Sequence, residues 1–371
     1  MVAAGPQTTL PAVTAETQWN FSVDFSNTSF STANSTSPDA GVPDELLHIL
    51  LPVVYSIICC IGLTGNTIVI YVVARMSRAR TVANSYILNL AIADELLLLS
   101  MPFLSVGYVT WDWPFGPVMC KLVFSADSVN MFASVFCLTA MSIDRYQAVV
   151  HPMTSRGYRT IRRAVLINVT IWILALVVVS PVLVFTGLHE SGGNVYCNIN
   201  WPEPVEAWRV AFIAYSGLLG CVMPLAVITV CAVFIVRSFR RHRRSKRRGQ
   251  ARDSRQIFRN RERTITRVVF AVVITFFVCW LPFYIFNIVN LVSPIPISQH
   301  NKWLFHFFAS VSYGNSCLNP LIYIGLNSHC RKNVWDLCCS WTGVDTSRST
   351  GLVQVTSIRL SSLSRAQSDR R

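Results

Sequence analysis

Seven long apolar stretches dominate the pattern of hydrophobic and polar positions along the chain. They cover residues 47–74, 83–109, 117–149, 163–186, 207–237, 264–292 and 302–326. A helix needs about 20 mainly apolar residues to cross the hydrocarbon core of a membrane, and each stretch is long enough. None of them repeats another at a fixed period, which argues against a solenoid. The pattern predicts an all-α membrane protein with a seven-transmembrane helix bundle over residues 47–326.

Composition and charge set the orientation of this bundle. Of the 371 residues 52% are hydrophobic and 13% are charged, which excludes an ordinary soluble domain. The net charge of +14 gathers in alternate loops, at Arg75, Arg78 and Arg80, at Arg156, Arg159, Arg162 and Arg163, and in "RSFRRHRRSKRRGQARDSRQ". Because positive loops stay in the cytoplasm, we expect a multi-pass plasma membrane protein with its N-terminus outside and its C-terminus inside. The basic charge then belongs to loops beside the membrane, and we expect no nucleic-acid partner.

The segments outside the spans differ in character. Residues 1–46 hold no Lys or Arg and form an extracellular tail, in which N-glycosylation is predicted at the sequons Asn20, Asn27 and Asn34. The third cytoplasmic loop covers about residues 238–262, and its basic run also suits anionic lipid contact. A short amphipathic eighth helix is predicted over residues 327–339. The Ser/Thr-rich tail 340–371 is predicted to be disordered, and it either recruits arrestin-like regulators when phosphorylated or is passive.

Four cysteines lie at positions where disulfide formation or palmitoylation is expected. Cys120 opens the third span at its outer end and Cys197 lies in the outer loop "HESGGNVYCNINW", so both face an oxidising space. We predict a disulfide between them that holds this loop against the bundle. Cys338 and Cys339 end the amphipathic stretch beside the membrane. They are candidates for palmitoylation, and free thiols are the alternative.

Asp127 is a carboxylate inside the apolar third span. It lies seven residues after Cys120, about 10 Å below the outer end of the helix. A charge at this depth is costly and faces the bundle interior. Because no Lys or Arg in the outer halves of the spans is an evident partner, we expect a ligand cation to pair with it. The alternative is a neutral or hydrated structural acid.

Asp94 lies deeper, near the middle of the second span. Polar residues of spans one, three and seven fall at a similar depth, namely Asn66, Asn130, Ser134, Asn315, Ser316 and Asn319. Carboxylate, amide and hydroxyl oxygens suit a hard monovalent ion with water rather than a transition metal. We therefore predict an allosteric sodium site and no other cofactor. The alternative is a hydrogen-bonded polar core around a protonated Asp94.

Arg145 stands at the inner end of the third span, in "MSIDRYQAVVHP". It lies about 27 Å below Asp127, at the cytoplasmic boundary. Asp144 can pair with it locally and Glu262 can pair with it from the start of span six. Two breaks in the helices follow, at Pro282 beneath Trp280 in "CWLPF" and at "NSCLNPLIY", which holds Pro320 and ends at Tyr323.

These features form an ordered set with at least one group in each span. The set comprises Asn66, Asp94, Cys120, "DRY" at 144–146, Trp172, Pro224, "CWLP" at 279–282 and "NPLIY" at 319–323. It resembles the rhodopsin-like G-protein-coupled receptors over about residues 45–340. The segments "SYILNLAIADE", "DSVNMF", "FCLTAMSIDRYQAVVHP" and "CWLPFYIFN" are similar to the somatostatin receptors, with the opioid receptors as nearest relatives.

The resemblance implies coupling to inhibitory Gi/o proteins, lowering of cAMP and a peptide ligand whose Trp-Lys pair enters the outer cup. Asp127 would take the ligand lysine. The implied binding residues are Asp127, Asn130, Met131, Trp280, Phe283, Asn287 and Tyr313, with Met131 in place of the glutamine of many family members. The implied coupling and switch residues are Asp144, Arg145, Tyr146, Glu262, Pro282, Pro320 and Tyr323.

The residues themselves favour a peptide ligand and a two-state mechanism. Acidic side chains prevail outside, at Asp44, Glu45, Asp112, Glu190, Glu203 and Glu206, and would attract a cationic peptide. Agonist at Asp127 would favour an outward position of span six, and sodium at Asp94 would favour the closed state and weaken agonist binding.

Other classes of protein are less consistent with the sequence. An amine receptor usually carries several hydroxyls on span five, where Ser216 stands alone in "RVAFIAYSGLLG", whereas an opioid-like or other neuropeptide receptor remains an alternative. An ion-coupled secondary transporter usually shows inverted repeats, and none is evident. A retinal protein needs a lysine in span seven, which lacks one between Trp303 and Leu326. No catalytic constellation is evident, so we expect no enzyme.

Overall fold

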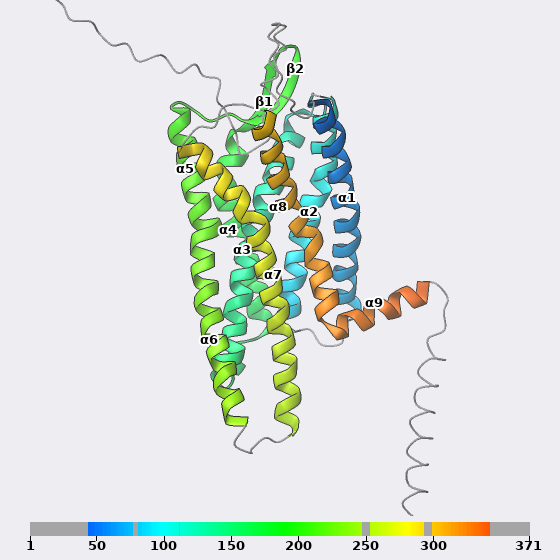
Figure 1. The fold of residues 1–371 in the computed structure, drawn as a ribbon, viewed down its shortest axis with the longest axis vertical. Helices are drawn as coiled ribbons and strands as arrows, with labels where there is room; N and C mark the ends of the chain where they lie inside the picture. The colour runs from blue at the N-terminus through cyan, green and yellow to red at the C-terminus, as the bar shows by residue number, and fades with distance from the viewer. Residues whose placement is uncertain (1–43, 77–80, 111, 247–252, 293–298, 342–371) are drawn as a thin grey trace, which may run out of the picture.

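The computed structural model describes residues 44–76, 81–110, 112–246, 253–292 and 299–341. Figure 1 shows an upright bundle of long helices, with a two-stranded hairpin at one end and a short helix that runs sideways at the other. We call these the hairpin end and the α9 end. The all-α bundle of seven long helices with a short eighth helix, predicted from the sequence, is confirmed. Asn20, Asn27, Asn34 and residues 342–371 lie outside the described residues.

The first four spans are single long helices, one of which continues into a π-helical turn. They are α1 (Asp44–Tyr71) with η1 (Val72–Met76), α2 (Val82–Thr110), α3 (Gly116–Val150) and α4 (Ile161–Phe185). A 3₁₀ turn, η2 (Thr154–Gly157), precedes α4. Thr160 ends the connection as an N-cap, since its side chain accepts a hydrogen bond from the Arg163 backbone amide.

The fifth span is interrupted and the later spans are long. The fifth consists of α5 (Val205–Gly217), the π-helical turn η3 (Leu218–Val222) and α6 (Met223–Lys246). The sixth is α7 (Asp253–Val292) and the seventh is α8 (Gln299–Leu326). Spans one to six are long and apolar enough to cross a membrane by length and composition, and α8, with 28 residues, packs against α1 and α7. Because α6 ends at Lys246 and α7 begins at Asp253, most of the segment expected to be the third cytoplasmic loop is helical.

Helix α3 occupies the middle of the bundle and α4 its periphery. Helix α3 packs against α2, α4, α6 and α7, and Val135, Cys137 and Leu138 are fully buried in it. In contrast, Leu166 and Ile173 of α4 are exposed. Lipid tails are as apolar as leucine, so an exposed apolar face is stable on the outside of a membrane bundle. Polar groups on α3 therefore face other helices rather than lipid.

The hairpin is formed by β1 (Thr186–Ser191) and β2 (Asn194–Ile199), which pair antiparallel. Gly192 and Gly193 connect them with φ of 62° and 86°. Positive φ at both central residues is what a two-residue type I′ hairpin turn requires, and glycine adopts it without strain. The sequence analysis treated this segment as a loop and missed the strands. The Gly-Gly pair was the available signal.

Helix α9 (Ser328–Trp341) leaves the bundle after α8, as Figure 1 shows. Its first turn is capped by Asn327, whose Oδ1 accepts a hydrogen bond of 3.3 Å from the Cys330 backbone amide. Cys330 is buried and Trp335 is 67% exposed, so the helix is amphipathic. Burial raises the pKa of the Cys330 thiol to about 11, which keeps it protonated and unreactive at neutral pH. The side chains of Cys338 and Cys339 lie outside the described residues.

Candidate functional site

A cavity that opens to solvent lies between α2, α3, α7 and α8, and the empty space in and above it, open solvent included, is about 550 Å³. Its wall is mainly apolar and aromatic, with four polar residues among them. The lining residues are Leu104, Val123, Phe124, Asp127, Ser128, Trp280, Phe283, Phe305, Ala309, Ser312 and Tyr313. Concave, mostly apolar sites with a few convergent polar groups are typical of ligand sites.

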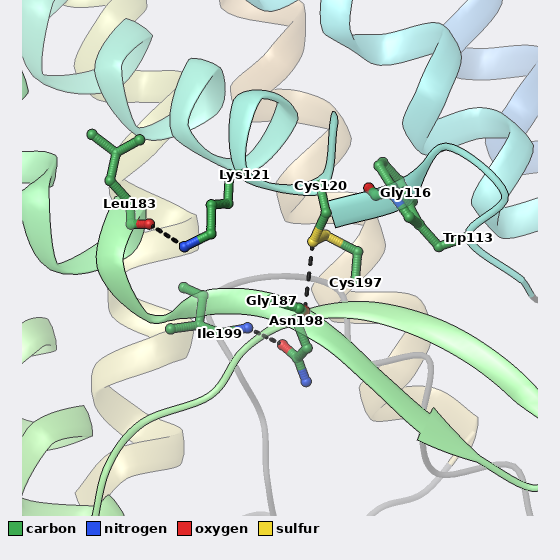
Figure 2. Close-up of a disulfide and its surroundings, with 9 residues drawn as sticks. All are labelled: Trp113, Gly116, Cys120, Lys121, Leu183, Gly187, Cys197, Asn198 and Ile199. Carbon is green, nitrogen blue, oxygen red and sulfur yellow. Dashed lines mark hydrogen bonds between the residues drawn. A yellow bond between two sulfur atoms is a disulfide. The ribbon is translucent and has the colours of Figure 1, made fainter. Parts of the chain in front are cut away.

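Asp127 is the acidic group of this cavity. Its Oδ1 is buried and has no hydrogen-bond partner among the described residues, and no ion pair of this part of the chain includes it. Lys121 lies on the same helix, but its Nζ donates to the backbone oxygens of Leu183 and Val184 at 2.9 and 3.2 Å. Figure 2 shows this lysine directed at α4. Within the described residues this carboxylate oxygen therefore keeps a free acceptor position that faces the cavity.

Aromatic rings form the wall opposite this carboxylate. Trp280 and Phe283 of α7 meet edge to face with ring centroids 6.3 Å apart, and Phe283 lies 5.7 Å from Phe305 of α8. Tyr313 packs edge to face on Tyr55 of α1 at 5.6 Å. Ring faces attract both cations and other aromatic groups. The cavity suits a ligand that presents a cation beside an aromatic ring.

Four of the seven residues predicted for ligand binding line the cavity, namely Asp127, Trp280, Phe283 and Tyr313. The sequence analysis missed residues such as Phe124, Phe305 and Ser312. Phe305, Ala309, Ser312 and Tyr313 follow helical spacing along α8, and Phe124 lies one turn before Asp127. This periodicity was the signal that could have found them.

The other three predicted residues, Asn130, Met131 and Asn287, are not among the residues that line this cavity, and their role in ligand binding stays a prediction. Asn130 donates from Nδ2 to Asp94 at 3.2 Å, so it faces the middle of the bundle. Met131 is buried, and its sulfur accepts a 3.0 Å hydrogen bond from the Tyr284 hydroxyl. Asn287 donates to the Phe283 backbone oxygen of its own helix at 2.8 Å. The rotation of each helix about its axis decides which neighbour a side chain contacts. The position of a residue along the helix does not give this rotation.

The disulfide between Cys120 and Cys197, predicted from the sequence, is confirmed and is shown in Figure 2. It joins the start of α3 to β2, with the two Cα atoms 5.6 Å apart. The other side of β2 is held by the α2–α3 connection, because Asp112 Oδ1 accepts from the Val195 amide at 2.9 Å and the Trp113 amide donates to the Val195 oxygen at 2.8 Å. The hairpin is therefore held at the end of α3 that contains the cavity.

Asp94 is fully buried and accepts hydrogen bonds from three uncharged groups. The donors are Asn130 Nδ2 at 3.2 Å, Ser316 Oγ at 2.8 Å and Asn319 Nδ2 at 2.9 Å. Among the polar residues predicted to surround Asp94, four buried oxygens have no partner within the described ranges, namely Asn66 Oδ1, Ser134 Oγ, Asn315 Oδ1 and Asn319 Oδ1. These residues fit a small hard cation by their oxygen chemistry. The three donors also satisfy the alternative of a hydrogen-bonded polar core.

Arg145 lies at the α9 end in a closed network of charges. It is buried, forms an ion pair with Asp144 and donates from Nη1 to Glu262 of α7 at 2.8 Å. Arg159 also pairs with Asp144, with Nε to Oδ1 at 2.8 Å, and the sequence analysis missed this contact. Tyr146 lies beside the network, with its hydroxyl 3.1 Å from His151 Nε2.

The remaining predicted switch residues are two prolines inside helices and one buried tyrosine. Pro282 lies inside α7 between Trp280 and Phe283, and Pro320 lies inside α8. Tyr323 is buried and lines a second cavity, with about 330 Å³ of space, between α1, α2, α3, α7 and α8. Pro282 therefore lies beside the cavity at the hairpin end, whereas Tyr323 lines a separate cavity.

Comparison with known proteins identifies the family. Residues 65–323 match the family described as 7 transmembrane receptor (rhodopsin family). The chain is 40% identical to somatostatin receptor type 2 of Sus scrofa over 314 residues, covering 84% of this chain and 83% of the relative. It is 43% identical to somatostatin receptor type 5 of Bos taurus over 306 residues, covering 82% and 80%. It is 46% identical to somatostatin receptor type 3 of Homo sapiens over 275 residues, covering 74% and 64%.

These relatives are receptors, so the prediction that the chain is not an enzyme is confirmed. The family match also agrees with the geometry of a cavity at one end and a charge network at the other. The chain belongs to the rhodopsin family of seven-transmembrane receptors, in the somatostatin receptor group.

Proposed function

We propose that this multi-pass plasma membrane protein is a receptor for a somatostatin-like cationic peptide, and that it activates inhibitory Gi/o proteins and so lowers cAMP. The observation that carries the proposal is that Asp127 Oδ1, in an aromatic cavity, has no partner among the residues the structure describes. The kinship with somatostatin receptors supports the peptide class of ligand.

Asp127 is the proposed partner of a lysine ammonium on the peptide. A charge-assisted hydrogen bond is stronger than a neutral one, and a site shielded from water strengthens it further. The rings of Phe283 and Phe305, at 5.7 Å, provide an apolar surface for a neighbouring aromatic side chain of the peptide. Ligands that lack either group would leave part of this surface unsatisfied.

The hairpin end is the proposed extracellular side. A disulfide persists in an oxidising space, and the Cys120–Cys197 bond lies at this end. The positive-inside rule independently directs the basic segments of α6 and α7 to the cytoplasm. In this orientation Asn20, Asn27 and Asn34 accept glycans, and palmitoyl groups on Cys338 and Cys339 hold α9 to the membrane.

Helix α7 is the proposed route from ligand to G protein. It carries Trp280 and Phe283 in the cavity wall and Glu262 in the charge network, about 27 Å from Trp280 along the axis. A ligand that favours a different position of the cavity end of α7 also favours separation of Glu262 from Arg145, by its differential affinity for the two states. Arg145 then becomes available to the G protein.

The second part of the proposal is an allosteric sodium site. Asp94, Asn130, Ser134, Asn315 and Asn319 would hold the ion, and Asn66 and Ser316 lie beside them. The bound ion supplies positive charge that neutralises the buried carboxylate. Its differential affinity for the closed state weakens agonist binding, and reciprocal linkage requires agonist to weaken sodium binding equally.

The cytoplasmic side offers two further proposed partners. Phosphorylation of the Ser/Thr-rich tail 340–371 recruits arrestin-like regulators through its added negative charge. The basic residues of α6 and of the segment that follows it contact anionic lipid as well as the G protein.

The proposal is tested by expressing the full chain in cells with a cAMP reporter. Somatostatin-type peptides, opioid peptides and amine ligands are applied in turn, with untransfected cells as the control. Somatostatin-type peptides are expected to lower forskolin-raised cAMP, and pertussis toxin is expected to abolish the effect because it blocks Gi/o. A response to opioid peptides or amines alone, or a rise in cAMP, would reject the assignment.

A further inference from the structure

Three spans meet at the hydroxyl group of Tyr284. Tyr284 follows Phe283 on α7, but it is absent from the lining of the ligand cavity in the described structure. Its side chain is buried, and its hydroxyl donates to Met131 Sδ of α3 at 3.0 Å. Its ring centroid lies 6.4 Å from that of Trp280. Tyr284 therefore packs against Trp280 of the cavity wall without lining the cavity itself.

Gly220 provides the space that this hydroxyl occupies. It lies in the π-helical turn η3, is buried, and has no left-handed backbone angle that would by itself require glycine. A Cβ atom at this position would lie 2.4 Å from the Tyr284 hydroxyl oxygen but 3.5 Å from the Cζ atom of the same ring. The first distance is a clash and the second is an ordinary contact. The close approach of one oxygen atom is thus what excludes a side chain.

The hydrogen bond from Tyr284 to Met131 is weak, so the hydroxyl can leave its position between α3 and η3. A buried phenol hydroxyl needs an acceptor, and a thioether sulfur is a weak one. Met131 stands where many members of the resembling family carry glutamine, whose carbonyl oxygen accepts hydrogen bonds more strongly than sulfur does. The hydroxyl in this chain is therefore held by a weak hydrogen bond to sulfur together with its fit between α3 and η3.

We propose that Tyr284, Met131 and Gly220 form a latch that holds α7 against α3 and the fifth span in the closed arrangement. Tyr284 is a positioning residue, since it acts on α7 through its fit. Any displacement of α7 away from the fifth span must first withdraw the hydroxyl from its slot. The latch couples the cavity wall at Trp280 to the distance between α6 and α7 at the α9 end. At that end the two helices are in contact, since the Arg263 guanidinium of α7 lies 5.5 Å from the Phe239 ring centroid of α6.

The first test is a double-mutant cycle on thermal stability of the full chain in detergent, which needs neither peptide nor G protein. Gly220→Ala is expected to lower the unfolding midpoint by about 5 °C, as overpacking does. In the Tyr284→Phe background the same alanine meets only the ring Cζ and Phe132 Cε1, both at an ordinary contact distance of 3.5 Å, so it should leave the midpoint unchanged. Gly217→Ala is the matched control, because a Cβ there meets nothing within 4 Å. An equal loss from Gly220→Ala in both backgrounds would overturn the proposed slot.

The second test measures whether the contact holds α7 in place. Spin labels at positions 241 and 263, in a background without reactive cysteines, report the distance between α6 and α7. Tyr284→Phe and Met131→Leu each remove the hydrogen bond at nearly constant volume. Each is expected to raise the population of longer distances about fivefold, and the double variant is expected to add little more. A purely structural role predicts lower yield with an unchanged distance distribution, and that result would overturn the latch.

Discussion

Two carboxylates on α3 differ in the completeness of their contacts. Asp127, in the cavity at the hairpin end, keeps a buried oxygen without a partner among the described residues. Asp144, at the α9 end, pairs with both Arg145 and Arg159. Both lie on one helix in one membrane protein. Helix burial alone therefore does not explain the difference, and the supply of neighbouring cations does.

This difference agrees with the two proposed roles, in which Asp127 receives a ligand cation and Arg145 exchanges Glu262 for another partner. An unpartnered acceptor gains energy when a ligand cation arrives, because the cost of burying the carboxylate has already been met by the fold. In the charge network, a new partner of Arg145 must compete with Glu262 at 2.8 Å. Helix α7 connects the two, since it contributes Phe283 to the cavity and Glu262 to the network. The following predictions test this comparison from the largest expected effect to the smallest.

Replacement of Asp127 by asparagine should have the largest effect. We expect the affinity for a somatostatin-type peptide to fall about 100-fold to 1,000-fold, because a buried ligand cation loses its counter-charge. Competition binding on membranes measures it. Glu206→Gln is the control, since Glu206 is 68% exposed in a surface ion pair and should change affinity by about twofold or less.

A neutral ligand sharpens the same prediction. A peptide with norleucine in place of lysine should bind wild type and Asp127→Asn with equal affinity. If norleucine and lysine peptides both lose affinity equally in the variant, Asp127 is not the lysine partner.

Cys120→Ser should affect the hairpin end next most strongly. Loss of a disulfide that closes a loop with a sequence separation of 77 residues should cost about 2–4 kcal/mol of stability. The unfolding midpoint of purified protein in detergent is the measurement. Cys60→Ser, at an exposed free thiol, should leave the midpoint unchanged. Equal midpoints for all three proteins would show that the hairpin end does not depend on this covalent tie.

Glu262→Gln should open the network at the α9 end. Removal of one carboxylate from Arg145 is expected to raise ligand-independent nucleotide exchange on Gi about tenfold, because a hydrogen bond to a charged group contributes about 1.5–3 kcal/mol to the closed state. Exchange is measured per receptor in membranes. The exposed Arg267 on the same helix provides the control variant Arg267→Gln. Unchanged basal exchange in Glu262→Gln would remove this ion pair from the switch.

Asp94→Asn tests the region between the two carboxylates. In wild type, exchange of NaCl for N-methylglucamine chloride should raise agonist affinity about fivefold, and in the variant the two salts should give the same affinity. An equal salt effect in both proteins would leave only the hydrogen-bonded polar core as the role of Asp94.

Arg159→Gln should give the smallest effect. Asp144 keeps Arg145 as its partner when Arg159 is removed, and the Arg159 side chain is 20% exposed, so basal exchange should rise only about twofold to threefold. An effect as large as that of Glu262→Gln would mean that Arg159, and not the α7 partner, controls the network.

Much of the fold and part of the site were predictable from the sequence. Span lengths follow from apolar runs, and the depth of Asp127 follows from its distance along α3 to Cys120. The Arg145–Glu262 ion pair at 2.8 Å joins residues that the sequence analysis had placed at the same membrane boundary. The contact of Arg159 with Asp144 was not predictable in the same way, because it depends on the conformation of the connection between α3 and α4.

The residues of the cavity wall could not be predicted from the sequence for a similar reason. Asn130 and Met131 lie next to each other on α3, yet one contacts Asp94 and the other contacts Tyr284. Successive helical residues point about 100° apart, so the rotation of α3 against its neighbours decides which of them reaches the cavity. Neither residue does.

The sequence by itself determined the number of spans, the depth of each charged group and the cysteine pair that joins α3 to β2. Only the tertiary structure decided which side chains face one another, including the aromatic wall opposite Asp127 and the glycine space that receives the Tyr284 hydroxyl. The physical reason is that helix rise sets a position along the axis from residue number alone, whereas rotation and separation of helices come from the packing of all spans together.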